Sequence, residues 1–188
     1  FEANQTCTTY AAIDVGAEWD CQTASTPAPL NGSYSAYNTA DGGDLRFRGS
    51  YPSAQNGTIY IMFLLHVETM PTATSAPILE TKAVSADAGF EIRIDGTNGH
   101  LIGTPDTGSD VNASDSSFAE DTTYRICAEY DIANDDLTIY QDAAGGTYCT
   151  TSVLTVDGTG TPADVDGFDV GLNTTGGVFY LDDVDTGS

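Results

Sequence analysis

Apolar and polar residues alternate with a period of two along much of the chain, which is the spacing of β-strands rather than helices. In the run 89–95 (GFEIRID) every second residue is apolar, so one face of a strand is expected to be buried. The run 58–68 (TIYIMFLLHVE) is apolar at both sets of alternate positions, as a central strand covered on both faces should be. No window has helical periodicity, because Gly, Thr, Ser and Asp interrupt the chain throughout.

Short strands at regular spacing, without helices, predict an antiparallel two-sheet sandwich. The segment IANDD joins two strand-like runs and predicts a β-hairpin. Strands on both sides of the loops at 21–31 and 71–77 are needed to close one core, so we expect a single domain over 1–188. The predicted strands are 44–49, 58–68, 76–84, 89–95, 100–103, 122–131, 137–142, 147–154, 166–172 and 178–184.

Composition and charge exclude several classes of protein. Apolar residues make up 40% of the 188 positions, which is enough for a core and argues against disorder. No apolar run approaches the ~18 residues of a membrane span, so no membrane insertion is expected. The net charge is −23, from 28 acidic and 5 basic residues. This balance excludes nucleic acid and anionic lipid as partners, and it indicates either a solubilising, salt-adapted surface or calcium-binding loops.

The four cysteines predict two disulfides. Proximity in sequence favours Cys7–Cys21 and Cys127–Cys149 among the three possible pairings. No CxxC motif or Cys/His cluster supports zinc. Disulfides indicate an oxidising location, so the protein is expected to be extracellular, on a cell surface or on a virion surface.

Five N-x-S/T sequons make the chain a candidate for N-glycosylation. The alternative is a Thr-rich composition that carries no glycan. The chain begins without an initiator Met, so its first residue is expected to be either a processed terminus or the edge of an excised segment. The sequon asparagines are Asn4, Asn31, Asn56, Asn112 and Asn173.

The order of several motifs resembles a known family. The chain opens with Phe1-Glu2, continues through the hairpin-like runs GFEIRIDGTNGHLIG and DTTYRICAEYDIANDDLTIYQDAAG, and closes with GVFYLDDVDTGS. Together these resemble the concanavalin A-like, LamG-type jelly rolls and, less closely, the calcium-bearing jelly-roll carbohydrate-binding modules. Thr123 departs from the pattern where the hairpin usually has Trp, and Ala143-Ala144 is a second departure. The resemblance implies an all-β, antiparallel two-sheet jelly-roll sandwich.

The closing strand suggests a structural calcium ion. Alternation places Phe179, Leu181 and Asp183 on one face and residues 178, 180, 182 and 184 on the other, with apolar residues on both. One of the carboxylates of Asp182 and Asp183 should therefore face apolar surroundings, where it is costly unless paired, and Ca²⁺ is a suitable partner. In the carbohydrate-binding jelly rolls the calcium site joins the two chain ends, which implies Glu2 with Asp182 or Asp183 here. The alternative is a carboxylate at a strand end, solvated or bonded to backbone N–H groups.

The sequence argues against an enzyme of the kinds that share this fold. The nearest acidic pair, Glu91 and Asp95, would lie about 13 Å apart on one strand. Retaining and inverting glycosidases need roughly 5–5.5 Å and 6.5–9.5 Å. A lyase site needs His, Tyr, Gln and Arg together, and His66 and His100 occur in no such run. A polysaccharide hydrolase or lyase is the third hypothesis.

Binding is the function that the pattern favours. Sugar sites combine exposed aromatic faces with carboxylates and amides. Tyr60 and His66 share one face of the central strand, and Tyr140 points outward on a later one. These three residues are the ligand-binding candidates. The alternative is that most tyrosines belong to the core or its rim and that His66 is a half-buried packing residue.

The predicted function is a non-catalytic extracellular recognition module that binds a glycan or another surface polymer, stabilised by calcium and disulfides. The alternative is a structural surface protein, such as a virion decoration or fibre subunit or a subunit of an extracellular filament. In that case the sandwich faces would bind copies of the same chain.

Overall fold

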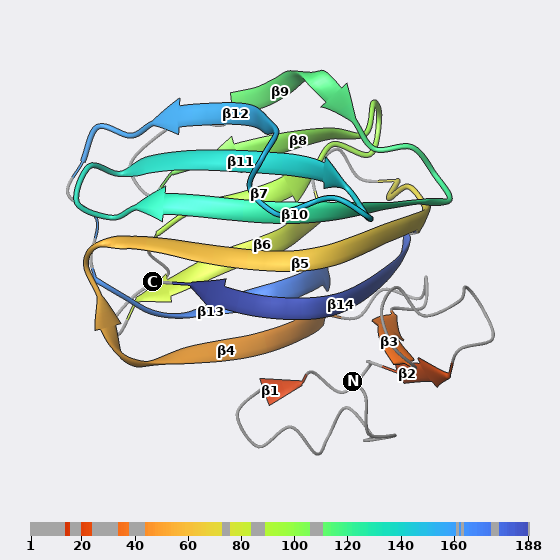
Figure 1. Cartoon of the computed structure of the whole chain (residues 1–188), viewed down its shortest axis with the longest axis horizontal. Helices are drawn as coiled ribbons and strands as arrows, with labels where there is room; N and C mark the ends of the chain where they lie inside the picture. Colours follow the sequence, from red (N-terminus) through yellow and green to blue (C-terminus); the bar gives the residue numbers. More distant parts are fainter. Residues whose placement is uncertain are drawn as a thin grey trace.

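Two seven-stranded antiparallel sheets lie face to face in the computed structural model (Figure 1), which confirms the all-β sandwich. The structure describes residues 14–15, 20–23, 34–37, 44–72, 76–83, 89–105, 111–160, 162, 164–173 and 177–187. These ranges contain no helix that could span a membrane. The strands are β1 (Asp14–Val15), β2 (Asp20–Thr23), β3 (Tyr34–Tyr37), β4 (Asp44–Gln55), β5 (Thr58–Thr69), β6 (Ala76–Ala83), β7 (Glu91–Ile94), β8 (His100–Thr104), β9 (Val111–Ser117), β10 (Thr122–Asp131), β11 (Asp136–Ala143), β12 (Ser152–Asp157), β13 (Val165–Asn173) and β14 (Val178–Gly187).

The first sheet has the strand order β1-β4-β13-β6-β7-β8-β9, and the second has β12-β11-β10-β5-β14-β3-β2. Sequence-distant strands are therefore neighbours: β5 pairs with β10 on one side and with the closing strand β14 on the other. This arrangement places three long strands at the centre of the second sheet, and their outward side chains form one continuous surface.

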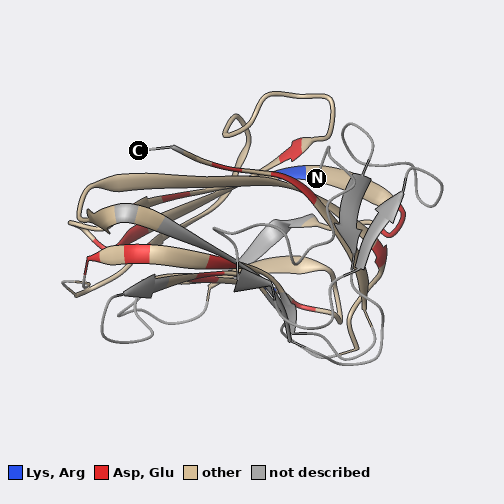
Figure 2. Cartoon of the chain, turned by 90° about the horizontal axis from the view of Figure 1, so that it is seen from below, with Lys and Arg blue, Asp and Glu red and all other residues tan. Residues whose placement is uncertain are grey.

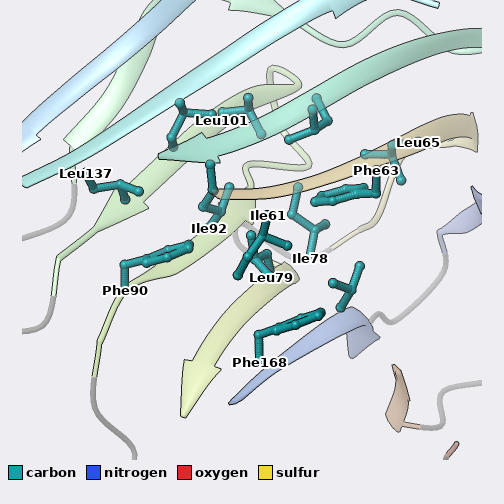
Figure 3. Close-up of a cluster of buried hydrophobic side chains, with 14 of the residues drawn as sticks. Ile61, Phe63, Leu65, Ile78, Leu79, Phe90, Ile92, Leu101, Leu137 and Phe168 are labelled. Carbon is teal, nitrogen blue, oxygen red and sulfur yellow. The ribbon is translucent and has the colours of Figure 1, made fainter. Parts of the chain in front are cut away.

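The core lies between the sheets and is built by alternation on these strands. Every second residue of β5, from Ile59 to Val67, points inward and is at most 1% exposed. On β7 the inward residues Ile92 and Ile94 are fully buried, which confirms the alternation predicted from the sequence. Figure 3 shows these aliphatic side chains packed with Phe63, Phe90 and Phe168 from both sheets. Each such side chain contributes about 1.5–3 kcal/mol through its removal from water.

Most predicted strands are confirmed, and the differences have physical reasons. β10 has the predicted bounds and forms the predicted hairpin with β11. The predicted strand 147–154 is wrong in its first half, because residues 147–151 form turns and β12 begins at Ser152. β9 (VNASDSS) was missed because its sequence is polar, without an apolar alternation, and it is an edge strand that pairs only with β8.

A β-bulge in β14 changes the direction of one predicted side chain. The pairing with β5 shifts register between Asp182 and Asp185, and Asp183 has a positive φ of 55°. Phe179 and Leu181 point into the core as expected. Asp183, which strict alternation would place with them, is instead exposed and approaches groups on the outer surface. The predicted shared face of Phe179, Leu181 and Asp183 is therefore wrong at the bulge.

Gly103 marks a close approach between the two sheets. A Cβ atom at this position of β8 would lie 3.0 Å from Leu154 Cδ2 and 3.1 Å from Ile139 Cδ1, both on the opposite sheet. We expect Gly103→Val to lower the free energy of unfolding by about 1–3 kcal/mol through overpacking. Urea denaturation measures this change. The control Gly57→Ala, at an exposed turn with no heavy atom within 4 Å of the added Cβ, should stay within about 0.5 kcal/mol of the wild type. Equal stability of the two variants would contradict the close packing.

Candidate ligand-binding face

The outer surface of the second sheet carries the sequence-predicted tyrosines. Because β5 buries its odd-numbered residues, Tyr60, Met62 and His66 point away from the core. Antiparallel register places Tyr60 opposite Glu129 on β10, and Met62 in the same row as Cys127. Cys127 in turn lies opposite Tyr140 on β11. The two candidate tyrosines thus occupy adjacent rows of one surface.

Glu129 links the two tyrosines. Tyr60 Oη donates a hydrogen bond to Glu129 Oε1 at 3.1 Å, and Tyr140 Oη donates to Glu129 Oε2 at 2.6 Å. We call these three residues the tyrosine–glutamate cluster. The hydrogen bond to the carboxylate, with burial and the negative charge of Glu129, raises the pKa of Tyr140 to about 12, and the same causes raise the pKa of Tyr60. The cluster therefore presents two neutral rings beside a carboxylate whose position is held by two hydroxyl groups.

Three aspartates form the next row on the same surface. Asp131, Asp136 and Asp157 are directly opposite one another on β10, β11 and β12. Burial, and then repulsion from Asp157 and Asp131, raises the pKa of Asp136. The Asp131 carboxylate accepts hydrogen bonds from the backbone N–H of Ala133 and from Asn134 Nδ2, as expected for Asx chemistry at a hairpin turn.

His66 does not join the cluster. It lies six residues along β5 from Tyr60, about 20 Å away at the rise of a strand, and only 8% of it is exposed. Its Nδ1 is 3.0 Å from Thr123 Oγ1, and its ring meets that of Tyr180 edge-on, with centroids 5.7 Å apart. Burial lowers the pKa of His66, although Asp121 and Glu68 oppose this effect. The structure thus gives His66 the packing environment that the alternative interpretation describes, with Thr123 at the position where the family pattern has Trp.

A disulfide holds the loop after β11 against this surface. The predicted Cys127–Cys149 bond is formed, with an S–S distance of 2.08 Å. Arg125 contributes a second attachment: its guanidinium carbon lies 4.4 Å from the centre of the Tyr148 ring, and its Nε donates to Ala144 O at 2.7 Å. The loop therefore lies beside Tyr140. The sequence pattern did not predict this loop, because residues 147–154 were expected to form a strand.

Asp142 provides the third attachment of this loop. Its buried carboxylate accepts hydrogen bonds from the hydroxyl and the backbone N–H of Thr150, and from the backbone N–H of Thr151 at 2.9 Å. Burial alone would raise the pKa of Asp142, but these hydrogen bonds outweigh it and lower the pKa below its usual value.

The candidate calcium ligands on β14 point to different surroundings. Asp182 is 4% exposed, opposite Leu64 on β5, and its Oδ1 accepts a hydrogen bond from the backbone N–H of Asp183 at 2.9 Å. Asp183 Oδ2 lies 3.9 Å from Arg125 Nη1. Glu2 lies outside the described residues. Within the described ranges, no group of three or more His, Cys, Asp or Glu side chains could hold a metal ion.

The remaining predicted modification sites are only partly described. Cys7 lies outside the described residues, as do Asn4 and Asn31. Asn56 is exposed at the turn between β4 and β5. Asn112 lies in β9 and Asn173 in β13.

Comparison with known proteins identifies the fold. No protein-family model matches the sequence, and no curated protein matches it. A type C botulinum neurotoxin structure matches with a TM-score of 0.62 and 12% identity over 93% of this chain and 42% of that chain. The binding domain of botulinum neurotoxin serotype D/C matches with a TM-score of 0.62 and 13% identity, over 93% of this chain and 43% of that chain. A sialidase matches with a TM-score of 0.62 and 12% identity, over 91% of this chain and 17% of the sialidase chain.

At such low identity these matches show the β-sandwich fold alone. The chain spans less than half the length of each of these structures. They do not select the LamG-type family, which stays a prediction from the sequence motifs.

The bonds of Asp142 predict an acid-dependent contribution to stability. A carboxyl group whose folded-state pKa lies below its unfolded value stabilises the fold above the unfolded pKa of about 3.9, and this contribution is lost as the pH falls through the folded pKa. We expect Asp142→Asn to lower the free energy of unfolding by about 1–3 kcal/mol at neutral pH. The difference from the wild type should shrink below about pH 4.

Urea denaturation across this pH range measures the effect of Asp142→Asn. The exposed Asp164 supplies the control, since Asp164→Asn removes one charge away from the loop. It should change the free energy of unfolding by less than about 0.5 kcal/mol. A difference between Asp142→Asn and wild type that is independent of pH would contradict the assignment.

Proposed function

We propose that this chain is a non-catalytic, extracellular recognition module that binds a glycan on the outer surface of its second sheet. The observation that carries the proposal is the tyrosine–glutamate cluster, in which Tyr60 and Tyr140 donate hydrogen bonds to the two oxygens of one carboxylate. Sugar sites pair an aromatic surface, against which the apolar face of a pyranose ring packs, with a fixed polar group that bonds its hydroxyls.

The cluster supplies both parts on a rigid support. Tyr60, Glu129 and Tyr140 lie on three adjacent strands and are partly exposed. Each Glu129 oxygen accepts one protein hydrogen bond and keeps a further lone pair for a sugar hydroxyl. Because two hydroxyl groups already hold the carboxylate, little side-chain entropy is lost when a ligand binds.

The structural neighbours support surface recognition as the class of role. Cell entry of type C botulinum neurotoxin depends on two ganglioside molecules, and toxin binding domains of this group form complexes with a sialylated ligand and with synaptotagmin II. Since this chain matches less than half of each of those chains, its own ligand is argued from its own residues.

Two features support an extracellular location. The Cys127–Cys149 disulfide requires an oxidising compartment to persist. The sequon at Asn56 is on an exposed turn, where a glycan can be attached.

The acids singled out from the sequence support a non-catalytic role. Glu91 forms an ion pair with Arg93, in which Glu91 Oε1 lies 3.5 Å from Arg93 Nε. Asp95 accepts a hydrogen bond from the backbone N–H of Thr97 within its turn. Both acids thus make local structural contacts at the two ends of β7.

Glycan binding is tested with a glycan array and isothermal titration. We expect Tyr60→Ala and Tyr140→Ala each to weaken binding at least about tenfold, because each removes a stacking surface and a bond to Glu129. Tyr140→Phe, which keeps the ring, should lose less. The control is Val111→Ala, since Val111 is 37% exposed at the edge of the other sheet. A protein that binds no glycan, and instead forms a symmetric oligomer or polymer, would support the structural alternative.

We also propose that calcium joins Asp182 or Asp183 to Glu2. The support is the sequence motif, which resembles the calcium-bearing jelly rolls at both chain ends, together with the place of both aspartates on the closing strand β14. A ligand present at 100 times its dissociation constant stabilises the folded state by about 2.7 kcal/mol. Removal of calcium with a chelator should therefore lower Tm by several degrees, as measured by calorimetry. A Glu2→Gln variant should be less sensitive to the chelator, and an unchanged Tm of the wild type would exclude structural calcium.

A further inference from the structure

We propose that the tyrosine–glutamate cluster selects a sugar with a free amino group, whose ammonium lies against Glu129 between the rings of Tyr60 and Tyr140. This inference rests on the proposed function and specifies the chemical class of its ligand. The occupant is an oligosaccharide of deacetylated hexosamine units rather than a neutral or acidic glycan.

Most of the basic residues lie on strands of the other sheet. The chain has five basic residues. Of the four in the first sheet, Arg46 and Arg48 are on β4, Lys82 is on β6 and Arg93 is on β7. Arg125 on β10 is the one that belongs to the second sheet. Figure 2 shows acidic residues recurring along the described strands.

Arg125 is already engaged and does not neutralise the cluster. Its side chain lies over the Tyr148 ring, donates to Ala144 O and faces Asp183. It is four residues from Glu129 along β10, about 13 Å at the rise of a strand. Within the described part of the chain, no ion pair involves Glu129. The charge of Glu129 is therefore left for a ligand to compensate.

The neighbouring rings favour a cation in the same place. The face of a tyrosine ring is electron-rich and attracts an ammonium group within about 6 Å of its centre, and aromatic side chains around a carboxylate are a common way to bind organic ammonium ions. In the cluster the two hydroxyl groups that hold the carboxylate belong to the two rings that flank it. An ammonium bound to this carboxylate would therefore lie near both tyrosines, a position that favours a cation over a neutral hydroxyl or an N-acetyl group.

The surrounding charge excludes an acidic sugar. The row formed by Asp131, Asp136 and Asp157 lies two residues along the strands from Glu129, about 7 Å away. The pKa of Asp136 is raised, with repulsion from Asp157 and Asp131 contributing after burial, so a negative potential already exists there. A carboxylate-bearing sugar would add to this repulsion, whereas a second amino group along an oligosaccharide would reduce it.

The experiment compares a glucosamine oligomer with the N-acetylglucosamine oligomer of the same length, by titration calorimetry at about pH 6, where the amines are protonated. A carboxylate-bearing oligosaccharide and a lysine-rich peptide with the same positive charge complete the set. We expect the glucosamine oligomer to bind at least about tenfold more tightly than the N-acetylated one at low ionic strength, with a smaller ratio at high salt. The carboxylate-bearing sugar should bind least.

Variants show whether the preference belongs to the cluster. Glu129→Gln keeps the shape of the side chain and should bring the ratio between the two oligomers close to one. Asp164→Asn removes one exposed charge immediately before β13 in the first sheet and should leave the ratio unchanged. Tyr60→Phe keeps the ring and should retain the preference, whereas Tyr60→Leu should reduce it. This pair tests the cation–π contribution if Glu129→Gln is unstable.

Each other outcome is decisive. Equal affinity for the two oligomers, or an equal effect of Glu129→Gln and Asp164→Asn, would overturn the amine preference and leave glycan binding standing. A lysine-rich peptide that binds as tightly as the glucosamine oligomer would overturn the assignment to a sugar. If neither these oligomers nor any other glycan binds, the proposed function itself fails.

Discussion

The strict alternation of side chains along β5 is the constraint on which the rest of the structure depends. Its inward residues, from Ile59 to Val67, are almost fully buried, so a shift of register by one residue would move all of them to the solvent side. The same constraint fixes the pairing of β10 and β14 on its two sides. Once the register is fixed, Tyr60 must lie opposite Glu129, and Tyr180 must lie beside His66. The outer surface is therefore a consequence of how the core is packed.

Two of the three attachments of the loop after β11 have a different origin. The disulfide and the carboxylate of Asp142 join the loop before β12 to residues on β10 and β11. They add little to the inner core, because Cys149 and Thr150 come from a turn region. Their effect is to cover part of the outer surface beside Tyr140 and to leave Tyr60 and Glu129 partly exposed. A surface that is covered on one side and rigid underneath is suited to holding a ligand in one orientation.

The charge distribution has a topological cause. Four of the five basic residues occur on strands of the first sheet, although they are scattered along the sequence from Arg46 to Arg93. The acids that surround the tyrosine–glutamate cluster come from three consecutive strands, β10 to β12. The basic residues that oppose the net negative charge are thus mostly on strands of the first sheet, and the second sheet has only Arg125. This asymmetry is the basis for the cationic ligand that we propose for the outer surface of the second sheet.

The candidate site shows how far the sequence could be interpreted. Tyr60 and Tyr140 could be proposed because alternation tells which side chains point outward. Their shared partner, Glu129, was missed, since cross-strand neighbours depend on a register that no local pattern specifies. His66 was grouped with Tyr60 because both point outward on β5, but a shared face does not imply proximity over six residues of an extended strand. Packing against Tyr180 and Thr123, both distant in sequence, decides its environment.

The sequence by itself determined the all-β class, the hairpin of β10 and β11, and the outward direction of Tyr60 and Tyr140. These properties depend on local periodicity and turn residues, which each segment carries independently of the others. The tertiary structure alone decided the pairing of β5 with β14, the bulge that turns Asp183 outward, and the meeting of Tyr60, Glu129 and Tyr140. These depend on contacts between residues that are in places more than a hundred positions apart, such as Tyr60 and Gly187. Only burial of the common core selects them, because no single segment contains the information.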